Sequence, residues 1–348
     1  VCGHNEGSTM MMNSGLIRTC DYFYNSGGWD DYPPQHDLRS HTERYKDTAP
    51  IVSTAFYIRA AKILRQCAQR LYLKSDVKMY DADIAKMSKA ILDNAWDSET
   101  EYFGYVTHDE NGKPNGIYRY KDGKNFNMGL DGVSPLVAGI CNPEQEEMLT
   151  DHIFDPEKLW TNVGISTVDQ SAPYYSHSGY WNGCVWMPHQ FVIWKTMLDL
   201  GKPELAEKIA MTALDSWAFE NGETYQCYEH FMVESGRGKG WHNFSGLSSP
   251  VVNWFSAYFS LGQVSTGFDV MVCSPKMSSD YTEYTAELIF DKDAAGRTAS
   301  IILCMDPSKT YTATLDGKPL NLEMKRPGLL YVSVPERIKP AQFKVAAD

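Results

Sequence analysis

The sequence lacks the features that most often bind a protein to membranes or nucleic acids. No stretch approaches about 18 consecutive apolar residues, so we expect no segment that crosses a bilayer. No run of lysine and arginine occurs, and the formal net charge is −12. Because a surplus of negative charge repels phosphate backbones and anionic lipids, we expect neither nucleic acid nor membrane as a partner. The first 20 residues also lack the basic start and apolar centre of a signal peptide.

The eight cysteines argue against a structural metal centre. They lie 18 or more residues apart, with no Cys-x-x-Cys pair and no Cys/His cluster at zinc-ligand spacing. Scattered cysteines in a chain of this size are more often buried apolar residues than disulfides. We therefore expect no structural zinc site. No cofactor is predicted, calcium stays possible without a supporting motif, and the disulfide state, the compartment and the oligomeric state stay open.

Hydrophobic and aromatic residues are abundant. The 348 residues are 43% hydrophobic and include 9 tryptophans and 21 tyrosines, enough for one large domain or for one large and one small domain. Many of these rings are clustered with glycine and asparagine. Such clusters suit carbohydrate, whose C–H faces stack on rings while its hydroxyl groups need polar partners.

Residues before about 265 have mainly helical periodicity. Apolar residues recur at three- and four-residue steps over residues 48–73, with Thr48 as the expected N-cap and Pro50 in the first turn. A second helix is expected to start at Ser75. The last helix, at residues 249–261, is apolar nearly all round, so we expect it to be buried on all sides. The other expected helices cover residues 134–140, 143–154, 186–200 and 203–217.

Two regions have the pattern of β-structure. Residues 102–120 predict a hairpin around the turn Asp109-Glu110-Asn111-Gly112. After residue 265 the period becomes two, and Asp316-Gly317 indicates a tight turn. We therefore predict a mainly α domain at residues 1–265, followed by a small antiparallel, β-sandwich-like domain at 266–348. The expected strands are at residues 283–290, 298–305, 311–315 and 329–334.

Two carboxylates beside aromatic residues suggest chemistry on a sugar. Asp30 lies in the run Gly-Gly-Trp-Asp-Asp-Tyr-Pro-Pro, and Glu229 lies in Tyr-Glu-His-Phe. Cleavage of a glycoside needs one protonated carboxyl group and one ionised carboxylate. The ring of Trp29 and the charge of Asp31 would both favour the protonated form of Asp30. The alternative, about equally frequent for Asp in glycine-rich turns, is that Asp30 or Asp31 ties down a loop or caps a helix.

A third motif lies between these two, and together they resemble a known family. Residues 180–189 read Tyr-Trp-Asn-Gly-Cys-Val-Trp-Met-Pro-His. In this order the three motifs resemble those of glycoside hydrolase family 63, its mannosylglycerate-hydrolase-like relatives and the related trehalases. The resemblance covers about residues 14–262. It implies an (α/α)₆ toroid and inverting hydrolysis, with Asp30 as general acid and Glu229 as general base.

The chain also departs from the family pattern. The family's Trp-Arg is Trp181-Asn182 here, its Gly-Pro is Gly183-Cys184, and its Ser-Pro-Arg ending is Tyr-Pro-Pro. Without the bidentate cation, specificity for an acidic aglycone such as glycerate is not expected. About eight helices are predicted where a closed toroid has twelve. We expect the others to lie upstream of Val1 or to come from another chain.

Seven further residues are expected to bind the sugar. Any single tryptophan among them is at least as often a core residue, and a histidine at a helix start is more often structural. The predicted aromatic contacts are Trp29, Trp181, Trp186 and Trp241, and the predicted hydroxyl partners are Gln35, His189 and Asn243.

Rival carboxylates and a possible metal have also to be weighed. Asp31 is the strongest rival to Asp30, followed by Asp169, Glu223 and Glu234. Some relatives bind calcium, but the sequence has no EF-hand-like spacing, so no metal ligand is predicted.

The favoured hypothesis is an inverting, exo-acting α-glycosidase that acts on a small glycoside or an oligosaccharide terminus. The alternative is a carbohydrate-binding protein without catalysis, or an inactive fragment of such an enzyme. A toroidal lyase or phosphorylase would need another acid–base set or a phosphate pocket, which the sequence does not indicate. The sugar and the linkage are not predicted, and a location outside the cytoplasm is favoured only by analogy.

Overall fold

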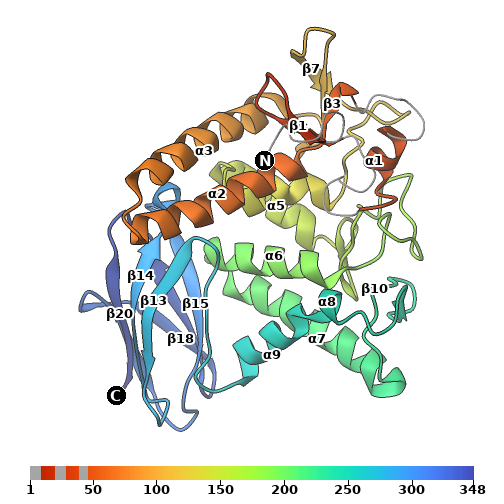
Figure 1. Ribbon diagram of the computed structural model, residues 1–348. Coiled ribbons are helices and arrows are strands. Elements are labelled where there is room, and N and C mark those ends of the chain that lie inside the picture. Colours follow the sequence, from red (N-terminus) through yellow and green to blue (C-terminus); the bar gives the residue numbers. More distant parts are fainter. Residues whose placement is uncertain (1–8, 20–28, 39–45) are drawn as a thin grey trace. The chain divides into compact units, whose positions relative to one another are not determined.

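The computed structural model describes residues 9–19, 29–38 and 46–348 (Figure 1). Their contacts form two compact units. Unit 1 consists of Val1–Ala68, Tyr72–Trp186 and Glu229–Trp241, and unit 2 consists of Gln69–Leu71, Met187–Tyr228 and His242–Asp348. The two units are defined by contacts between residues and do not test the expected domain boundary after residue 265, which stays a prediction.

The helices of unit 1 follow the sequence pattern closely, with one correction. The predicted helices are confirmed as α2 (Val52–Arg70), α3 (Lys74–Asn94), α4 (Ser134–Ala138) and α5 (Pro143–Phe154). The start expected at Thr48 is wrong, because Thr48–Ala49 forms strand β3 and pairs with Thr107 and Val106. The start of α5 has a capping box, in which Asn142 accepts from Gln145 N at 2.8 Å and Gln145 accepts from Asn142 N at 3.1 Å.

The predicted hairpin of unit 1 is also confirmed. It consists of β6 (Val106–His108) and β7 (Pro114–Ile117). In its turn, Asp109 Oδ1 accepts hydrogen bonds from the backbone of Asn111 and Lys113, each at 2.9 Å. The remaining strands of the unit are short antiparallel pairs: β1 (Thr9–Met11) with β2 (Ile17–Thr19), β4 (Trp96–Asp97) with β5 (Tyr102–Phe103), β8 (Trp160–Thr161) with β9 (Gly164–Ile165), and β10 (His230–Phe231) with β11 (Gly238–Lys239).

Four segments of unit 1 that are distant in sequence lie side by side through single β-bridges. The bridges join Gly129 to Val168, Ser166 to Val185, and Val185 to Phe231. The last of these has both backbone hydrogen bonds, Val185 N to Phe231 O and Phe231 N to Val185 O, at 2.9 Å each. We call this row of segments the bridge ladder. It connects the loop before the short helices η3 (Leu130–Val133) and α4 to β10.

The helices of unit 2 are α6 (Met187–Asp199), α7 (Pro203–Thr224), α8 (Ser245–Ser248) and α9 (Pro250–Phe259). The expected break between α6 and α7 is confirmed at Gly201, whose φ is +66°. A Cβ there would lie 2.6 Å from the carbonyl oxygen of Thr298, so only glycine fits.

The burial expected for the last helix is wrong. In α9 the ring of Trp254 is fully buried, but Val252, Phe255 and Phe259 are between 51 and 69% exposed. The helix packs one face against α7 and strand β15 (Thr298–Cys304). Although α9 carries apolar residues on every face, the described residues bury only one of its faces.

The C-terminal part of unit 2 forms two antiparallel sheets around a shared apolar core. The predicted strands are confirmed, as is the turn at Asp316-Gly317. Five strands were not predicted: Val264–Ser265, Val270–Met277, Lys318–Pro319, Asn321–Arg326 and Ala341–Ala347. The four-stranded sheet has the order β12 (Val264–Ser265), β15, β19 (Leu329–Pro335), β18 (Asn321–Arg326). The five-stranded sheet has the order β13 (Val270–Met277), β14 (Glu283–Phe290), β20 (Ala341–Ala347), β16 (Tyr311–Leu315), β17 (Lys318–Pro319).

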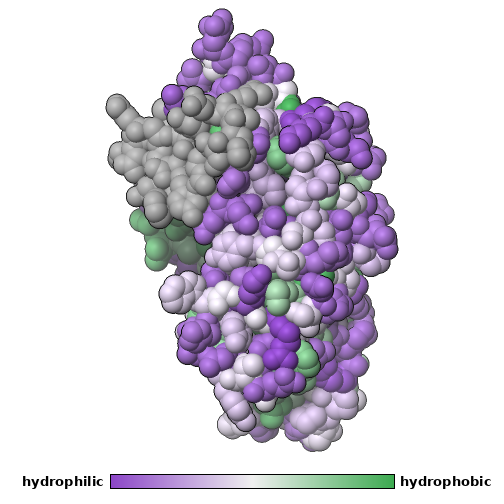
Figure 2. Space-filling model, turned by 90° about the vertical axis from the view of Figure 1, so that its right-hand side faces the viewer, coloured by the Kyte–Doolittle hydropathy of each residue, from purple (hydrophilic) through white to green (hydrophobic). Residues whose placement is uncertain are grey.

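On the face drawn in Figure 2, hydrophilic residues cover most of the described surface. Within the described ranges, no helix combines the length and the apolar character needed to cross a bilayer.

Candidate active site

The first acidic motif is anchored by its aromatic residues. Trp29 packs edge-on against Tyr32, with ring centroids 4.8 Å apart, and both rings are buried. The Tyr32 hydroxyl donates a hydrogen bond to Asn127 Oδ1 at 2.9 Å. Pro33 follows directly as the first residue of α1 (Pro33–Asp37), where its missing N–H costs nothing. Asp30 and Asp31 therefore lie in a short, fixed segment, whereas Gly27 and Gly28 lie outside the described residues.

A stack of aromatic rings joins the three motifs. The ring of Trp181 lies 5.5 Å from Trp29 and 3.8 Å from Trp186, with interplanar angles of 7° and 13°. Trp186 in turn stacks on His230 at 5.0 Å and 21°. None of the four side chains is more than 5% exposed. Segments about 50 to 150 residues apart in the chain therefore meet at one place in unit 1.

Both oxygens of the Glu229 carboxylate accept hydrogen bonds. The Tyr180 hydroxyl donates to Oε1 at 2.5 Å, and the backbone N–H of Trp241 donates to Oε2 at 3.1 Å. Gly240 has φ +80°, and a Cβ there would lie 2.3 Å from Oε2. Any other residue at position 240 would displace the carboxylate. The β10–β11 hairpin thus holds Glu229 in one orientation.

Tyr180 lies within the electrostatic reach of three carboxylates. Burial raises the pKa of its phenol, and the hydrogen bond to Glu229 together with the charges of Glu229, Asp30 and Asp31 raises it further above the ordinary value. The phenol is therefore protonated and a donor over the whole physiological pH range. Asp30, Asp31 and Glu229 are therefore all close enough to Tyr180 for their charges to act on its hydroxyl group, and Glu229 is in direct contact with it.

Asp31, the strongest rival to Asp30, has a visible structural task. Its Oδ1 accepts a hydrogen bond from the backbone N–H of Trp181 at 2.7 Å. Burial raises the pKa of Asp31, and the hydrogen bond from Trp181 opposes that increase. The loop-anchoring role that the sequence left open between Asp30 and Asp31 therefore fits Asp31.

The other residues predicted to contact the sugar differ in exposure and in the unit to which they belong. Trp241 is 71% exposed, so its ring is accessible, in contrast to the three stacked tryptophans. Gln35 is buried on α1, near Tyr105 and Asp131. His189 and Asn243 belong to unit 2, and their assignment to the site stays a prediction.

The remaining rival carboxylates lie elsewhere or are already paired. Asp169 forms a buried ion pair with His152, with Oδ2 and Nε2 2.8 Å apart. Glu234 is exposed in the β10–β11 turn, and Glu223 is exposed on α7 of unit 2. Over residues 9–19, 29–38 and 46–348, no group of three or more His, Cys, Asp or Glu side chains is arranged to hold a metal ion.

Three residues of this region were not singled out from the sequence. Tyr180 and His230 are adjacent in sequence to the predicted site residues Trp181 and Glu229. Adjacency in sequence does not show which group a side chain contacts. Asp131 is fully buried on η3, and burial raises its pKa to about 7, although a hydrogen bond from the Tyr105 hydroxyl opposes the increase. An acid within the apolar run 130–138 was its only sequence signal.

Comparisons with known proteins identify the family of the chain. The family model of the mannosylglycerate hydrolase MGH1-like glycoside hydrolase domain matches residues 18–245, which include all three motifs. No curated protein sequence matches the chain. The chain therefore carries the domain of a glycoside hydrolase. It belongs to the mannosylglycerate hydrolase MGH1-like family, and the resemblance seen in the motifs is confirmed.

Solved structures match the chain at low sequence identity, and the first of them shows the same kind of fold. A GH63 mannosylglycerate hydrolase from Thermus thermophilus, in complex with glucose, is 19% identical with a TM-score of 0.54, over 70% of this chain and 63% of its own. A sialidase is 12% identical with a TM-score of 0.50, over 81% and 26%. The neutral trehalase Nth1 from Saccharomyces cerevisiae is 15% identical with a TM-score of 0.46, over 67% and 45%. The chain thus spans less than two thirds of each of these proteins.

Proposed function

We propose that this protein is an inverting, exo-acting α-glycosidase in which Asp30 is the general acid and Glu229 the general base. The observation that carries the proposal is that the Tyr180 hydroxyl donates to Glu229 while the charges of Asp30 and Asp31 act on the same hydroxyl group. Asp31 already anchors the backbone of Trp181, so we assign the general acid to Asp30 and the general base to Glu229, the positions that the family resemblance implies. The family of the chain supports the reaction class.

The proposed reaction needs no group beyond these side chains and a water molecule. Asp30 donates a proton to the glycosidic oxygen as the bond to the anomeric carbon breaks. Glu229 accepts a proton from water, which attacks the opposite face of the sugar. Inversion requires the two carboxyl groups to stand roughly 6.5–9.5 Å apart, with the water between them. The hydrogen bonds from Tyr180 and from Trp241 N leave lone pairs of Glu229 for that water.

The substrate we propose is a neutral glycoside. The similar Thermus thermophilus enzyme is named for mannosylglycerate, which carries a carboxylate. In the present chain Asn182 stands where the family pattern has arginine, and its Oδ1 accepts a hydrogen bond from the backbone of Tyr180 at 3.0 Å. A side chain turned back to its own loop, and without charge, does not select an anion. The (α/α)₆ toroid is part of the same proposal and is supported by the fold similarity.

Substitution of each acid tests the assignment. Asp30→Asn and Glu229→Gln should each abolish hydrolysis of aryl α-glycosides and α-linked disaccharides, with an unchanged circular dichroism spectrum. Glu234→Gln, at an exposed position of the same hairpin, is the matched control and should retain activity. Wild-type turnover by either of the first two variants would reject its role.

Product stereochemistry tests the mechanism directly. Proton NMR during early turnover should show the anomer of inverted configuration first, and early appearance of the retained anomer would reject inversion. If the protein binds these sugars but cleaves none of them at any pH from about 4 to 8, the non-catalytic carbohydrate-binding alternative is correct instead.

A further inference from the structure

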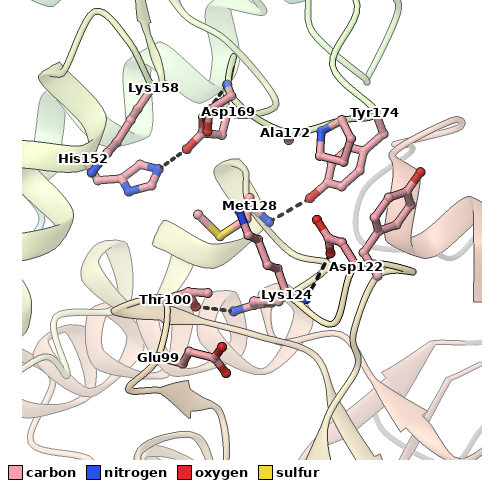
Figure 3. A pocket seen from close by; sticks show the side chains of 14 residues that line it. Glu99, Thr100, Asp122, Lys124, Met128, His152, Lys158, Asp169, Ala172 and Tyr174 are labelled. Carbon is pink, nitrogen blue, oxygen red and sulfur yellow. Dashed lines mark hydrogen bonds and ion pairs between the residues drawn. The ribbon is translucent and has the colours of Figure 1, made fainter.

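Unit 1 contains a polar cavity whose lining includes none of the candidate catalytic residues. It has a volume of about 330 Å³ and lies between the segments 99–100, 120–128, 152–158 and 169–174 (Figure 3). Sites for small molecules usually measure about 300–1,000 Å³, so this cavity suits one small ligand. The reaction proposed above makes no use of it.

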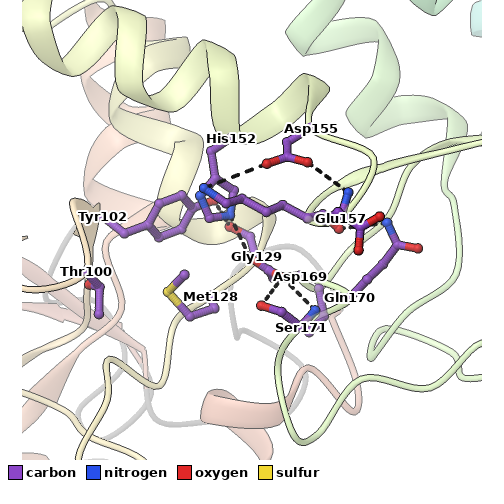
Figure 4. Close-up of polar contacts among 12 residues, drawn as sticks. Thr100, Tyr102, Met128, Gly129, His152, Asp155, Glu157, Asp169, Gln170 and Ser171 are labelled. Carbon is purple, nitrogen blue, oxygen red and sulfur yellow. Dashed lines mark hydrogen bonds and ion pairs between the residues drawn. The ribbon is translucent and has the colours of Figure 1, made fainter.

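The floor of the cavity consists of polar groups that are nearly inaccessible to solvent. Asn125, His152 and Asp169 are each at most 5% exposed. Asp169 is fixed by His152 and by Ser171, whose N–H and hydroxyl both donate to Oδ1 at 2.7 Å (Figure 4). Although burial raises the pKa of Asp169, these hydrogen bonds outweigh it and hold the pKa below its usual value. The floor therefore presents a fixed, ionised acceptor.

The amide of Asn125 adds a donor that the protein satisfies poorly. Its Nδ2 lies 3.4 Å from Thr100 Oγ1 and 3.5 Å from the carbonyl oxygen of Tyr102, both at the long limit of a hydrogen bond. Buried polar groups normally have good partners, because an unmet donor costs free energy. A hydroxyl group in the cavity would supply the missing partner.

One wall of the cavity is aromatic. The rings of Tyr120 and Tyr174 lie 5.2 Å apart, and both contact Phe126, which supports them. The Tyr174 hydroxyl donates to the carbonyl oxygen of Phe126 at 2.7 Å and accepts from the backbone of Met128 at 3.3 Å. The orientation of this wall is therefore fixed before any ligand binds. Rings of this kind stack on the C–H face of a sugar.

The charged residues around the opening balance one another. Lys124 and Lys158 are opposed by Glu99 and Asp122 (Figure 3). An anion or a cation would meet a like charge next to its partner, whereas hydroxyl groups can both accept from ammonium groups and donate to carboxylates. The opening therefore selects neither sign of charge. The ionised Asp169 at the floor disfavours an anion and accepts from hydroxyl groups, so the lining suits a hydroxyl-rich ligand.

The bridge ladder separates this cavity from Glu229. Met128 and Asp169 line the cavity and lie in the first two segments of the ladder, with Asp169 N donating to Met128 O at 3.0 Å. Two further steps, through Val185, lead to Phe231 in β10. Since neighbouring strands lie about 4.8 Å apart, the cavity wall is on the order of 10–15 Å from that strand. The cavity lining and β10 are thus different parts of unit 1, which supports a ligand distinct from the sugar cleaved at Glu229.

We propose that this cavity is a second, non-catalytic site that binds one neutral pyranose unit. The C–H face of the sugar packs against Tyr120, with Tyr174 beside it at an interplanar angle of 63°, and its hydroxyl groups contact Asn125 and Asp169 at the floor. The proposal does not depend on the roles of Asp30 and Glu229, because the cavity binds its ligand whether or not the chain hydrolyses glycosides.

Met128 provides a local probe for the test. The full chain with Glu229→Gln, which should not consume the ligand, is labelled with ¹³C at the methionine methyl groups. It is titrated with methyl α-glucoside, methyl α-mannoside and, separately, sulfate. We expect the Met128 signal to shift and saturate with at least one of the two sugars and to stay in place with sulfate.

Two variants connect the shift to the cavity. Tyr120→Leu should weaken sugar binding about fivefold to tenfold, in line with the loss of a stacking ring, whereas Tyr80→Leu on α3 should not. Lys124→Met, at an exposed position, is a second variant if Tyr120→Leu does not fold, and it should weaken binding several-fold. The proposal is wrong if neither sugar moves the Met128 signal, if only sulfate does, or if a folded cavity variant binds as tightly as the parent. Since the readout is binding, loss of turnover in the wild type leaves this result unaffected.

Discussion

Tyr180 donates a hydrogen bond to Glu229 across 49 residues of sequence, with 2.5 Å between the two oxygens. The tyrosine belongs to the tryptophan-rich loop, and the glutamate immediately precedes β10. This contact joins the side chains of two motifs whose backbones are also hydrogen-bonded through Val185 and Phe231. It also orients a carboxylate whose other oxygen is bound by the backbone of Trp241. The first prediction concerns this contact.

Tyr180→Phe should lower kcat about tenfold to a hundredfold and change KM little. The phenylalanine keeps the ring contacts with Trp186 and His230 but removes a hydrogen bond to a charged group, which contributes about 1.5–3 kcal/mol. Steady-state kinetics on an aryl α-glycoside provide the measurement. Tyr175→Phe is the control, since the Tyr175 hydroxyl has no hydrogen-bond partner within the described structure, and it should behave as wild type. Unchanged kcat in Tyr180→Phe would show that the contact is dispensable.

Two substitutions at Asp31 should separate anchoring from catalysis. Asp31→Asn keeps an oxygen that accepts from Trp181 N, so activity should stay within a few-fold of wild type. Asp31→Ala leaves that N–H without its acceptor and should lower the free energy of unfolding by about 1–3 kcal/mol. Urea denaturation and kinetics on both variants are the measurements. If Asp31→Asn abolishes turnover while Asp30→Asn retains it, the two aspartates have the opposite roles.

The buried imidazole of His230 should make the protein less stable in acid. Burial lowers its pKa to about 4; nearby Lys239 lowers it further, and Glu229 opposes the effect. In the unfolded chain the pKa is about 6.5, so between these values the unfolded state binds more protons than the folded state. Stability therefore falls as the pH falls through this window, by up to about 3 kcal/mol.

The measurement for His230 is urea denaturation at pH values near 7 and 4. His230→Phe retains a ring against Trp186 but cannot titrate, so its loss of stability over this range should be smaller than that of the wild type. His177→Gln, at an exposed position, should lose as much stability as the wild type. An equal pH dependence of wild type and His230→Phe would contradict the assignment.

Asp131 should have the opposite pH dependence. Burial raises its pKa to about 7 in the folded protein, so the folded state binds more protons than the unfolded state above the ordinary value of 3.8. The stability that this proton provides is lost as the pH rises through about 7. Asp131→Asn should remove that loss and make the protein more stable than wild type at pH near 8, by on the order of 1–3 kcal/mol. Asp93→Asn, on the exposed face of α3, is the control and should keep the pH dependence of the wild type. The prediction is refuted if the stability of Asp131→Asn depends on pH as strongly as that of the wild type.

The sequence predicted the bounds of an element correctly where those bounds depend on residues within or next to the element. The strands β14 and β16 have the predicted bounds, because alternation along each strand matches the side that faces the apolar core. The bounds of α5 follow from the capping residues Asn142 and Gln145, which lie next to the helix they start. The start of α2 could not be predicted in this way, since Thr48 pairs with Thr107, nearly 60 residues away.

By itself the sequence determined the family, the helical and β-rich regions, and the motifs that carry Asp30 and Glu229, because each of these depends on residues that are neighbours in the chain. The tertiary structure alone decided that Asp31 anchors Trp181, that Tyr180 binds Glu229, and that four rings stack between the motifs. It also decided which face of α9 is buried and which residues line the polar cavity of unit 1. These are contacts between segments that meet only after folding, so no local periodicity or motif records them.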